Sequence, residues 1–172
     1  MTDSTPSPTV TPTPLPVSAT GSTRRGSRRL VHRVRLEHLA VEFLRLVNAL
    51  RLPVPIEAVW QNPPLGLWNP ESATVADAQT PPPESGDPYA LRWRTALDIA
   101  RALGGTAWPA KVHLMGETPF SEEDCATFAR ALLVPTPLLS RLSERQKTPE
   151  LIQTIFKVPL AEARIRLKDL GL

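Results

Sequence analysis

Prolines mark the places where helices of this chain must begin or end. The chain has 172 residues and 20 prolines. Proline lacks a backbone N–H donor and clashes with the preceding helical turn, so a helix accepts it only in its first turn. Five prolines fall within the first sixteen residues, whereas apolar residues at helical spacing lie between the later ones. These features predict a series of short helices preceded by a non-helical segment.

The N-terminal segment differs from the rest of the chain in composition and charge. Residues 1–28 are rich in Pro, Ser and Thr and lack a sizeable apolar cluster, so we predict a disordered tail followed by a single domain over 29–172. Residues 1–35 carry a net charge of +5, and the remaining 137 residues carry −2. The domain is therefore not a basic nucleic-acid module. The basic arm could contact nucleic acid or an acidic partner through Arg24, Arg25, Arg28 and Arg29.

Apolar periodicity predicts a helix over 29–51, ended by Pro53. Its core-facing stripe consists of Leu36, Leu39, Phe43, Leu46 and Leu50. Proline positions, capping residues and glycines predict further helices over 56–61, 89–103, 121–134 and 136–142, and two more beginning near 149 and 159. Gly104 and Gly105 are expected to close the helix over 89–103.

Three short apolar runs between these helices are candidate strands: Leu65–Trp68, Ala73–Ala76 and Val112–Met115. They are too few and too short for a large sheet. The predicted fold class is α+β and predominantly helical, with a small or eroded β-sheet and a C-terminal helical pair.

Several functional classes receive no support from the sequence. Cys125 is the single cysteine, which excludes an internal disulfide and a zinc ribbon. No apolar run is long enough to span a bilayer, and the N-terminus lacks a secretory signal, so we expect a cytoplasmic protein without membrane contact. His32 and His38 are about 600° apart on a helix, and His113 is isolated, so the histidines predict no metal site.

Three segments, in this order, carry a resemblance to a known family: RWRTALDIARALGG, EEDCATFARALLVP and IFKVPLAEARIRLKDLGL. They resemble the core of the ImmA/IrrE family of zinc metallopeptidase-like proteins. That family shows an R-F-T-x-A-H-E-x-G-H helix, an E-x-x-A-x-x-F-A-x-x-L-L-M-P helix and an F-x-V-S-x-x-A-x-x-R-L-x-x-L-G-L ending. The resemblance covers roughly residues 36–172 and implies a zincin-like metallopeptidase scaffold.

The resemblance also implies that the zinc site is degenerate. The two histidine positions fall on Leu97 and Arg101, the general-base position on Asp98, and the acidic ligand position on Glu122. Leucine has no donor atom, and arginine does not lose its proton in proteins, so neither residue binds zinc. Asp98 keeps a carboxylate on a stem one methylene shorter than that of glutamate. We therefore expect no intact catalytic site and no zinc cofactor.

The surviving polar residues suggest how the charge of the lost metal is replaced. One hypothesis is that the Arg101 guanidinium pairs with Glu122, because a partly buried carboxylate without a cation is costly. The alternative is that Arg101 pairs with Asp98 at i,i+3 on an exposed helix face, which contributes only tenths of a kcal/mol.

The function expected from the resemblance is that of a pseudoprotease. It would bind a protein partner, such as a transcriptional repressor or a toxin–antitoxin-type protein, without cleaving it. Two alternatives remain. One is an active zinc-dependent endopeptidase with an unrecognised site. The other is a DNA-binding protein that uses its arginine arm or its C-terminal helix pair, in which Arg164, Arg166 and Lys168 are the basic residues.

Overall fold

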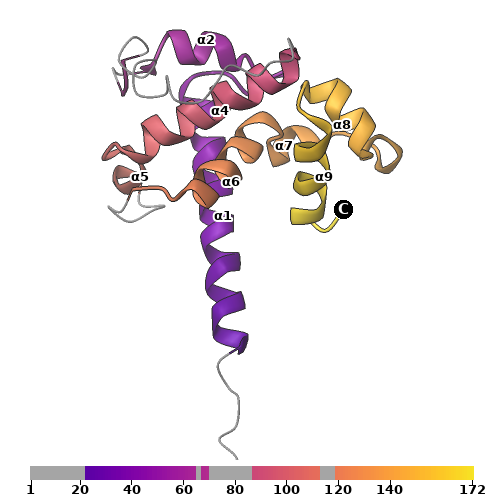
Figure 1. The fold of residues 1–172 in the computed structure, drawn as a ribbon, viewed down its shortest axis with the longest axis horizontal. Helices are drawn as coiled ribbons and strands as arrows, with labels where there is room; N and C mark the ends of the chain where they lie inside the picture. Colours follow the sequence, from indigo (N-terminus) through magenta and orange to yellow (C-terminus); the bar gives the residue numbers. More distant parts are fainter. Residues whose placement is uncertain (1–21, 65–66, 70–86, 113–118) are drawn as a thin grey trace, which may run out of the picture.

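The computed structural model of the chain describes residues 22–64, 67–69, 87–112 and 119–172, and side chains from Leu30 onward (Figure 1). This part of the chain is predominantly helical, as predicted. Its helices are α1 (Ser22–Leu46), α2 (Ile56–Gln61), α4 (Pro88–Gly104), α5 (Trp108–Lys111), α6 (Glu122–Leu133), α7 (Thr136–Leu139), α8 (Pro149–Phe156) and α9 (Leu160–Asp169), with a 3-10 turn at Glu144–Gln146. No helix among the described residues is long and apolar enough to cross a membrane.

The predicted sheet is not found within the described residues, which contain no strand. Parts of the candidate strands lie outside the described residues, namely residues 73–76, residues 113–115 and the first two residues of 65–68. Trp68 packs on the ring of Trp60, with ring centroids 5.9 Å apart, instead of pairing in a sheet. Before Val112 the chain forms α5, because Pro109 at the start of this segment favours a helical first turn.

Helix α6 lies at the centre of the domain, where it packs against both α1 and α4. Helix α2 packs on α4, and α9 packs on α8 and α6 (Figure 1). The core side chains from these elements are fully buried, and the largest of them are Phe43, Phe128, Phe156, Leu36, Leu39, Leu44, Ile56, Ile99, Leu103, Leu132 and Leu133. This arrangement holds the start of α6 against the C-terminal half of α4.

Both ends of α1 differ from the prediction. The helix begins at Ser22, so it extends into the segment that was predicted to be a disordered tail, and its N-terminal half projects from the domain (Figure 1). It ends at Leu46 because Asn48 adopts a left-handed backbone conformation, with φ of 50°. The N–H groups of Asn48 and Ala49 then donate to the carbonyls of Arg45 and Leu44 in a Schellman motif. Leu46, which was predicted to lie on the core-facing stripe, is 45% exposed.

The start of α6 is confirmed as a capping box. The Ser121 hydroxyl accepts from the backbone N–H of Asp124, and the Asp124 carboxylate accepts from the backbone N–H of Ser121 at 3.0 Å. Asp124 also lies 2.6 Å from Nε2 of His32 on α1. Burial alone would raise the pKa of Asp124, but the hydrogen bonds from Ser121 and His32 hold it below its usual value.

The two glycines after α4 do not act as the left-handed cap that their position suggests. Gly104 is the last residue of the helix, and Gly105 follows with φ of −84°. Gly104 is instead needed for close packing, because a Cβ atom there would lie 2.6 Å from the Phe120 ring. Phe120 in turn packs on Phe128, so this contact joins the end of α4 to α6.

Candidate functional site at the start of α6

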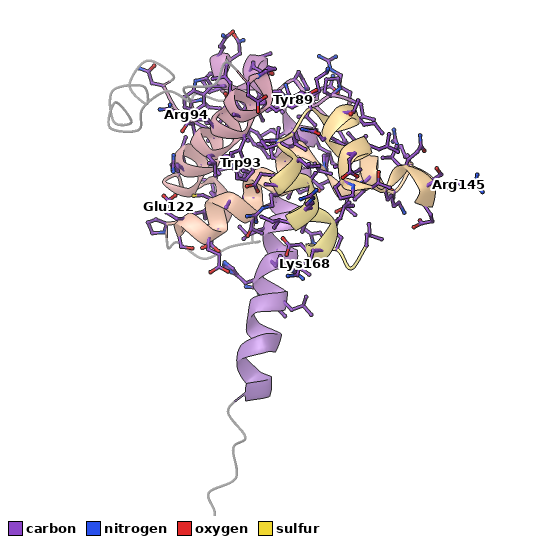
Figure 2. The ribbon with its side chains drawn as sticks, turned by 45° about the vertical axis from the view of Figure 1, so that its right-hand side comes forward. Tyr89, Trp93, Arg94, Glu122, Arg145 and Lys168 are labelled. Carbon is purple, nitrogen blue, oxygen red and sulfur yellow. The ribbon has the colours of Figure 1, made fainter. Side chains whose placement is uncertain are left out.

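The positions matched to the family's metal site lie on α4 and at the start of α6. Leu97 and Arg101 are four residues apart on α4, so both lie on one face of the helix. Glu122 is the first residue of α6, and Figure 2 shows its side chain at the surface. The packing of α6 on α4 brings Glu122 next to Arg101.

Arg101 contacts both candidate partners. Its Nη2 lies 3.0 Å from Oε2 of Glu122, and its Nε lies 3.4 Å from Oε1 of the same carboxylate. Its Nη1 lies 3.4 Å from Oδ1 of Asp98. The two hypotheses are therefore not exclusive, because one guanidinium donates to the carboxylates of its own helix and of α6 together.

The burial assumed for this pair is wrong. The Arg101 side chain is 40% exposed and that of Glu122 is 76% exposed. The Glu122 carboxylate is thus solvated, and leaving it without a cation would not carry the penalty of a buried charge. An exposed pair of this kind stabilises a protein by about 0–1 kcal/mol. The contact is geometrically specific, but it is not a strong support of the fold.

Leu97 belongs to the edge of the core. Its side chain is partly buried and packs against the buried apolar cluster of the domain. It provides no atom that could hold a metal ion. The hydrophobic contact fills the position at which the resembled family has its first histidine.

Cys125 lies one turn after Glu122 and is buried. The pKa of the Cys125 thiol is raised to about 11, mainly by burial and next by the nearby Glu122 carboxylate, while the Arg101 charge acts in the opposite direction. A thiol with this pKa is almost entirely protonated at neutral pH. Cys125 is therefore poorly suited to act as a nucleophile or as a metal ligand.

No group of three or more His, Cys, Asp or Glu side chains with metal-binding geometry occurs in the part of the chain that the structure describes. His32 is engaged with Asp124, and His38 is exposed on α1. His113 lies outside the described residues. Asp98 on α4 and Glu122 at the start of α6 are two carboxylates that both contact the Arg101 guanidinium.

Arg92 and Trp93, near the start of α4, have a structural role that the sequence did not predict. Arg92 donates to both oxygens of Glu57 at 2.7 Å, to the carbonyl of Val54 at 2.8 Å and to the carbonyl of Lys157 at 3.1 Å. These bonds join α4 to the segment before α2, to α2 and to the turn between α8 and α9. The following Trp93 lies under the Arg130 guanidinium, 5.8 Å from the ring centroid.

The C-terminal helix pair is predicted correctly as α8 and α9, but its basic residues do not form a common surface. Arg166 is buried, pairs with Glu37 on α1 and donates to the carbonyl of Val134 at 3.0 Å. Arg164 is exposed and lies 3.8 Å from Glu150. Lys168 is exposed as well. Because Arg166 is not available to a ligand, recognition of DNA by three basic residues of this pair is not supported.

The arginine arm lies on the projecting half of α1. The side chains of Arg24, Arg25, Arg28 and Arg29 lie outside the described residues. Of the two later arginines, Arg33 lies 3.0 Å from Asp169 on α9, and Arg35 is exposed.

Comparison of the chain with models of protein families, with curated proteins and with solved structures found no match. The resemblance to the ImmA/IrrE family therefore rests on the three sequence segments that carry it.

Proposed function

We propose that this protein is a catalytically inactive metallopeptidase-like domain that regulates a partner protein by binding it. The partner class that the resemblance favours is a transcriptional repressor or a toxin–antitoxin-type protein. The main supporting observation is the contact of Arg101 with Glu122, since these residues occupy two of the three ligand positions of the resembled family. A fixed positive charge takes the place of a metal ion in this proposal.

Hydrolysis is not expected from such a site. Metallopeptidases use a metal ion to lower the pKa of a bound water molecule and a carboxylate to accept its proton. Leu97 cannot hold a metal, Arg101 remains protonated, and the Asp98 carboxylate lies beside the Arg101 guanidinium. A domain with these residues can still bind a former substrate and shift its conformational equilibrium through differential affinity.

Zinc binding tests the resemblance and the loss of activity together. The wild-type chain is expected to bind no stoichiometric zinc. The double variant Leu97→His/Arg101→His restores two imidazoles beside Glu122 and is expected to bind one zinc ion per chain, measured by elemental analysis and by the spectrum of bound Co²⁺. Leu97→His alone is the matched control and should not bind. Stoichiometric zinc in the wild-type chain, with proteolysis lost in Asp98→Asn, would establish the active endopeptidase instead.

Partner binding is tested in the native cell with the full chain. A tagged chain is expected to co-purify with a regulatory protein whose intact mass shows no cleavage. The dissociation constant of the purified pair is then measured with wild-type chain and with Arg101→Glu, which places a second carboxylate beside Glu122. Weaker binding by Arg101→Glu supports this surface as the contact, whereas a cleaved partner contradicts the proposal.

A further inference from the structure

Helix α1 carries apolar side chains on a face that does not contact the core. Leu30, Val31 and Val34 are 55%, 53% and 45% exposed. Nine residues separate Leu30 from the buried Leu39, which places the two side chains about 180° apart around the helix axis. The helix is therefore apolar on two opposite faces, of which only one is covered by α6 and the rest of the core.

The exposed face continues along the helix into a groove. Val34 is followed at helical spacing by His38 and Val41, which line a groove of about 660 Å³, although Val41 is only 9% exposed. Glu37, Glu42 and Arg45 also line the groove, and Arg45 is paired with Glu42. Pro137, which follows the start of α7, lines the opposite wall. From Leu30 to Arg45 the face is about 22 Å long, which is roughly four helical turns. A surface of this shape and length fits a second helix.

The charge of α1 restricts what can occupy this face. Residues 22–35 contain six arginines and no acidic residue, so two copies of α1 packed together would bring like charges into contact. Along residues 22–35 a negatively charged occupant is therefore favoured. Nucleic acid would satisfy the charge, but its phosphates would leave Leu30 and Val34 without an apolar partner. An anionic membrane is less favoured, because helices that lie in the membrane interface insert large aromatic and aliphatic side chains and this stripe has no aromatic residue.

We propose that the exposed face of α1, with the groove at its C-terminal half, binds an amphipathic helix whose apolar stripe is flanked by acidic residues. The stripe of the partner packs on Leu30 and Val34 and reaches the small exposed area of Val41. Its acidic residues lie beside the arginines of the projecting half of α1, of which Arg35 is exposed. This inference rests on the proposed function in that the partner is a protein, and it is independent of the degenerate metal site.

The experiment uses the full chain and a designed probe. The probe is a helical peptide of three heptads, about 21 residues, with Leu at the a and d positions and Glu at the e and g positions. Binding is measured by fluorescence anisotropy. The matched control peptide carries Lys in place of Glu and is expected to bind at least tenfold more weakly, because its charges oppose those of α1.

Protein variants locate the site. Leu30→Ser/Val34→Ser is expected to weaken binding of the acidic peptide by about tenfold, since two apolar contacts are lost. Leu91→Ser is the matched control, because Leu91 is 56% exposed on α4, and it should bind like wild type. All of these positions are exposed, so circular dichroism should show unchanged helix content.

Three outcomes would overturn the proposal. They are equal affinity for the two peptides, equal effects of the α1 and Leu91 substitutions, and absence of peptide binding. A concentration-dependent dimer in sedimentation velocity that is lost in Leu30→Ser/Val34→Ser would identify a second copy as the occupant. Tighter, salt-sensitive binding to a DNA duplex or to phosphatidylserine vesicles would identify those ligands. If a captured partner protein binds the Leu30→Ser/Val34→Ser variant as tightly as wild type, the proposed function stands and this surface is excluded as the binding site.

Discussion

Two arginines, Arg101 and Arg166, each pair with a glutamate from another helix, but the two pairs lie in opposite environments. The side chains of Arg101 and Glu122 are 40% and 76% exposed. Those of Arg166 and Glu37 are 2% and 14% exposed, and Arg166 also donates to the Val134 carbonyl and lies 3.3 Å from the Thr136 hydroxyl. The buried pair joins α9 to α1 and to the end of α6. The comparison shows that the same chemical pair can be buried and join several elements in one place and lie at the surface in another.

The largest expected effect comes from breaking the buried pair. Arg166→Met removes the guanidinium from the Val134 carbonyl and from Glu37, which keeps the Thr136 hydroxyl as a donor; removal of one partner of a buried pair typically costs about 3–5 kcal/mol. Urea denaturation measures the free energy of unfolding. The double variant Arg166→Met/Glu37→Met removes both charges and should be more stable than Arg166→Met alone. A loss below about 1 kcal/mol in the single variant would mean that the two pairs are energetically alike.

A smaller effect is expected from the packing that positions the exposed pair. Gly104→Ala places a Cβ atom against the Phe120 ring, two residues before Glu122, and should destabilise the domain by about 1–3 kcal/mol. The matched control is Gly105→Ala. A Cβ there has its nearest neighbours 3.7 Å away, so the free energy of unfolding should change by no more than about 0.5 kcal/mol. Similar midpoints for the two variants in thermal denaturation would contradict the close contact at Gly104.

The exposed pair itself should contribute little to stability. Arg101→Ala is expected to lower the free energy of unfolding by about 0.2–1 kcal/mol, and the difference should shrink at high salt because solvent ions screen exposed charges. A double-mutant cycle with Glu122→Ala isolates the coupling between the two side chains. Coupling as large as that of Arg166 with Glu37 would remove the distinction between the two environments.

The smallest effect is on the reactivity of Cys125, which reports on the exposed pair. Because the pKa of this thiol is about 11, its modification by a thiol reagent in the native protein should be slow at pH 8 and accelerate toward pH 11. Arg101→Ala should slow the reaction and Glu122→Ala should accelerate it, since their charges lower and raise the pKa, respectively. Unchanged rates in both variants would place the thiol beyond the influence of the pair.

The same thiol predicts the direction of a pH effect on stability. The unfolded state ionises near the ordinary value of 9.0, while the folded thiol stays protonated to about pH 11. The unfolded state therefore releases its proton first, and the contribution of Cys125 to stability should fall as pH rises from about 9 to 11. Cys125→Ser removes this dependence, and urea denaturation across this range measures it.

Local sequence signals predicted the positions of most helices because their causes are local. Ser121 and Asp124 close a capping box within four residues, and Pro149 begins α8 at the residue after its cap. The bounds of α2 were also predicted correctly. The end of α1 was not, because residues 47–51 continue an apolar pattern, and the left-handed conformation of Asn48 is one of several that this residue accepts.

The candidate site was predicted only in part. The spacing within α4 put Leu97, Asp98 and Arg101 on neighbouring positions, and this followed from helix geometry alone. Whether Arg101 reached Glu122 depended on how α6 packs on α4, and the exposure of the pair depended on the same packing. The role of Arg92 could not be predicted, because its partners are 35 to 65 residues away in the sequence.

The sequence by itself determined where helices form, because caps, prolines and apolar spacing act over a few residues. Tertiary structure alone decided which arginine became buried. Helical spacing turns Arg166 away from Arg164 and Lys168, but only the packing of α9 brings it against Glu37 and the Val134 carbonyl. Burial and pairing of a charge depend on elements that meet only after folding, and for that reason the helical spacing of Arg166 did not reveal that it would become a buried structural arginine.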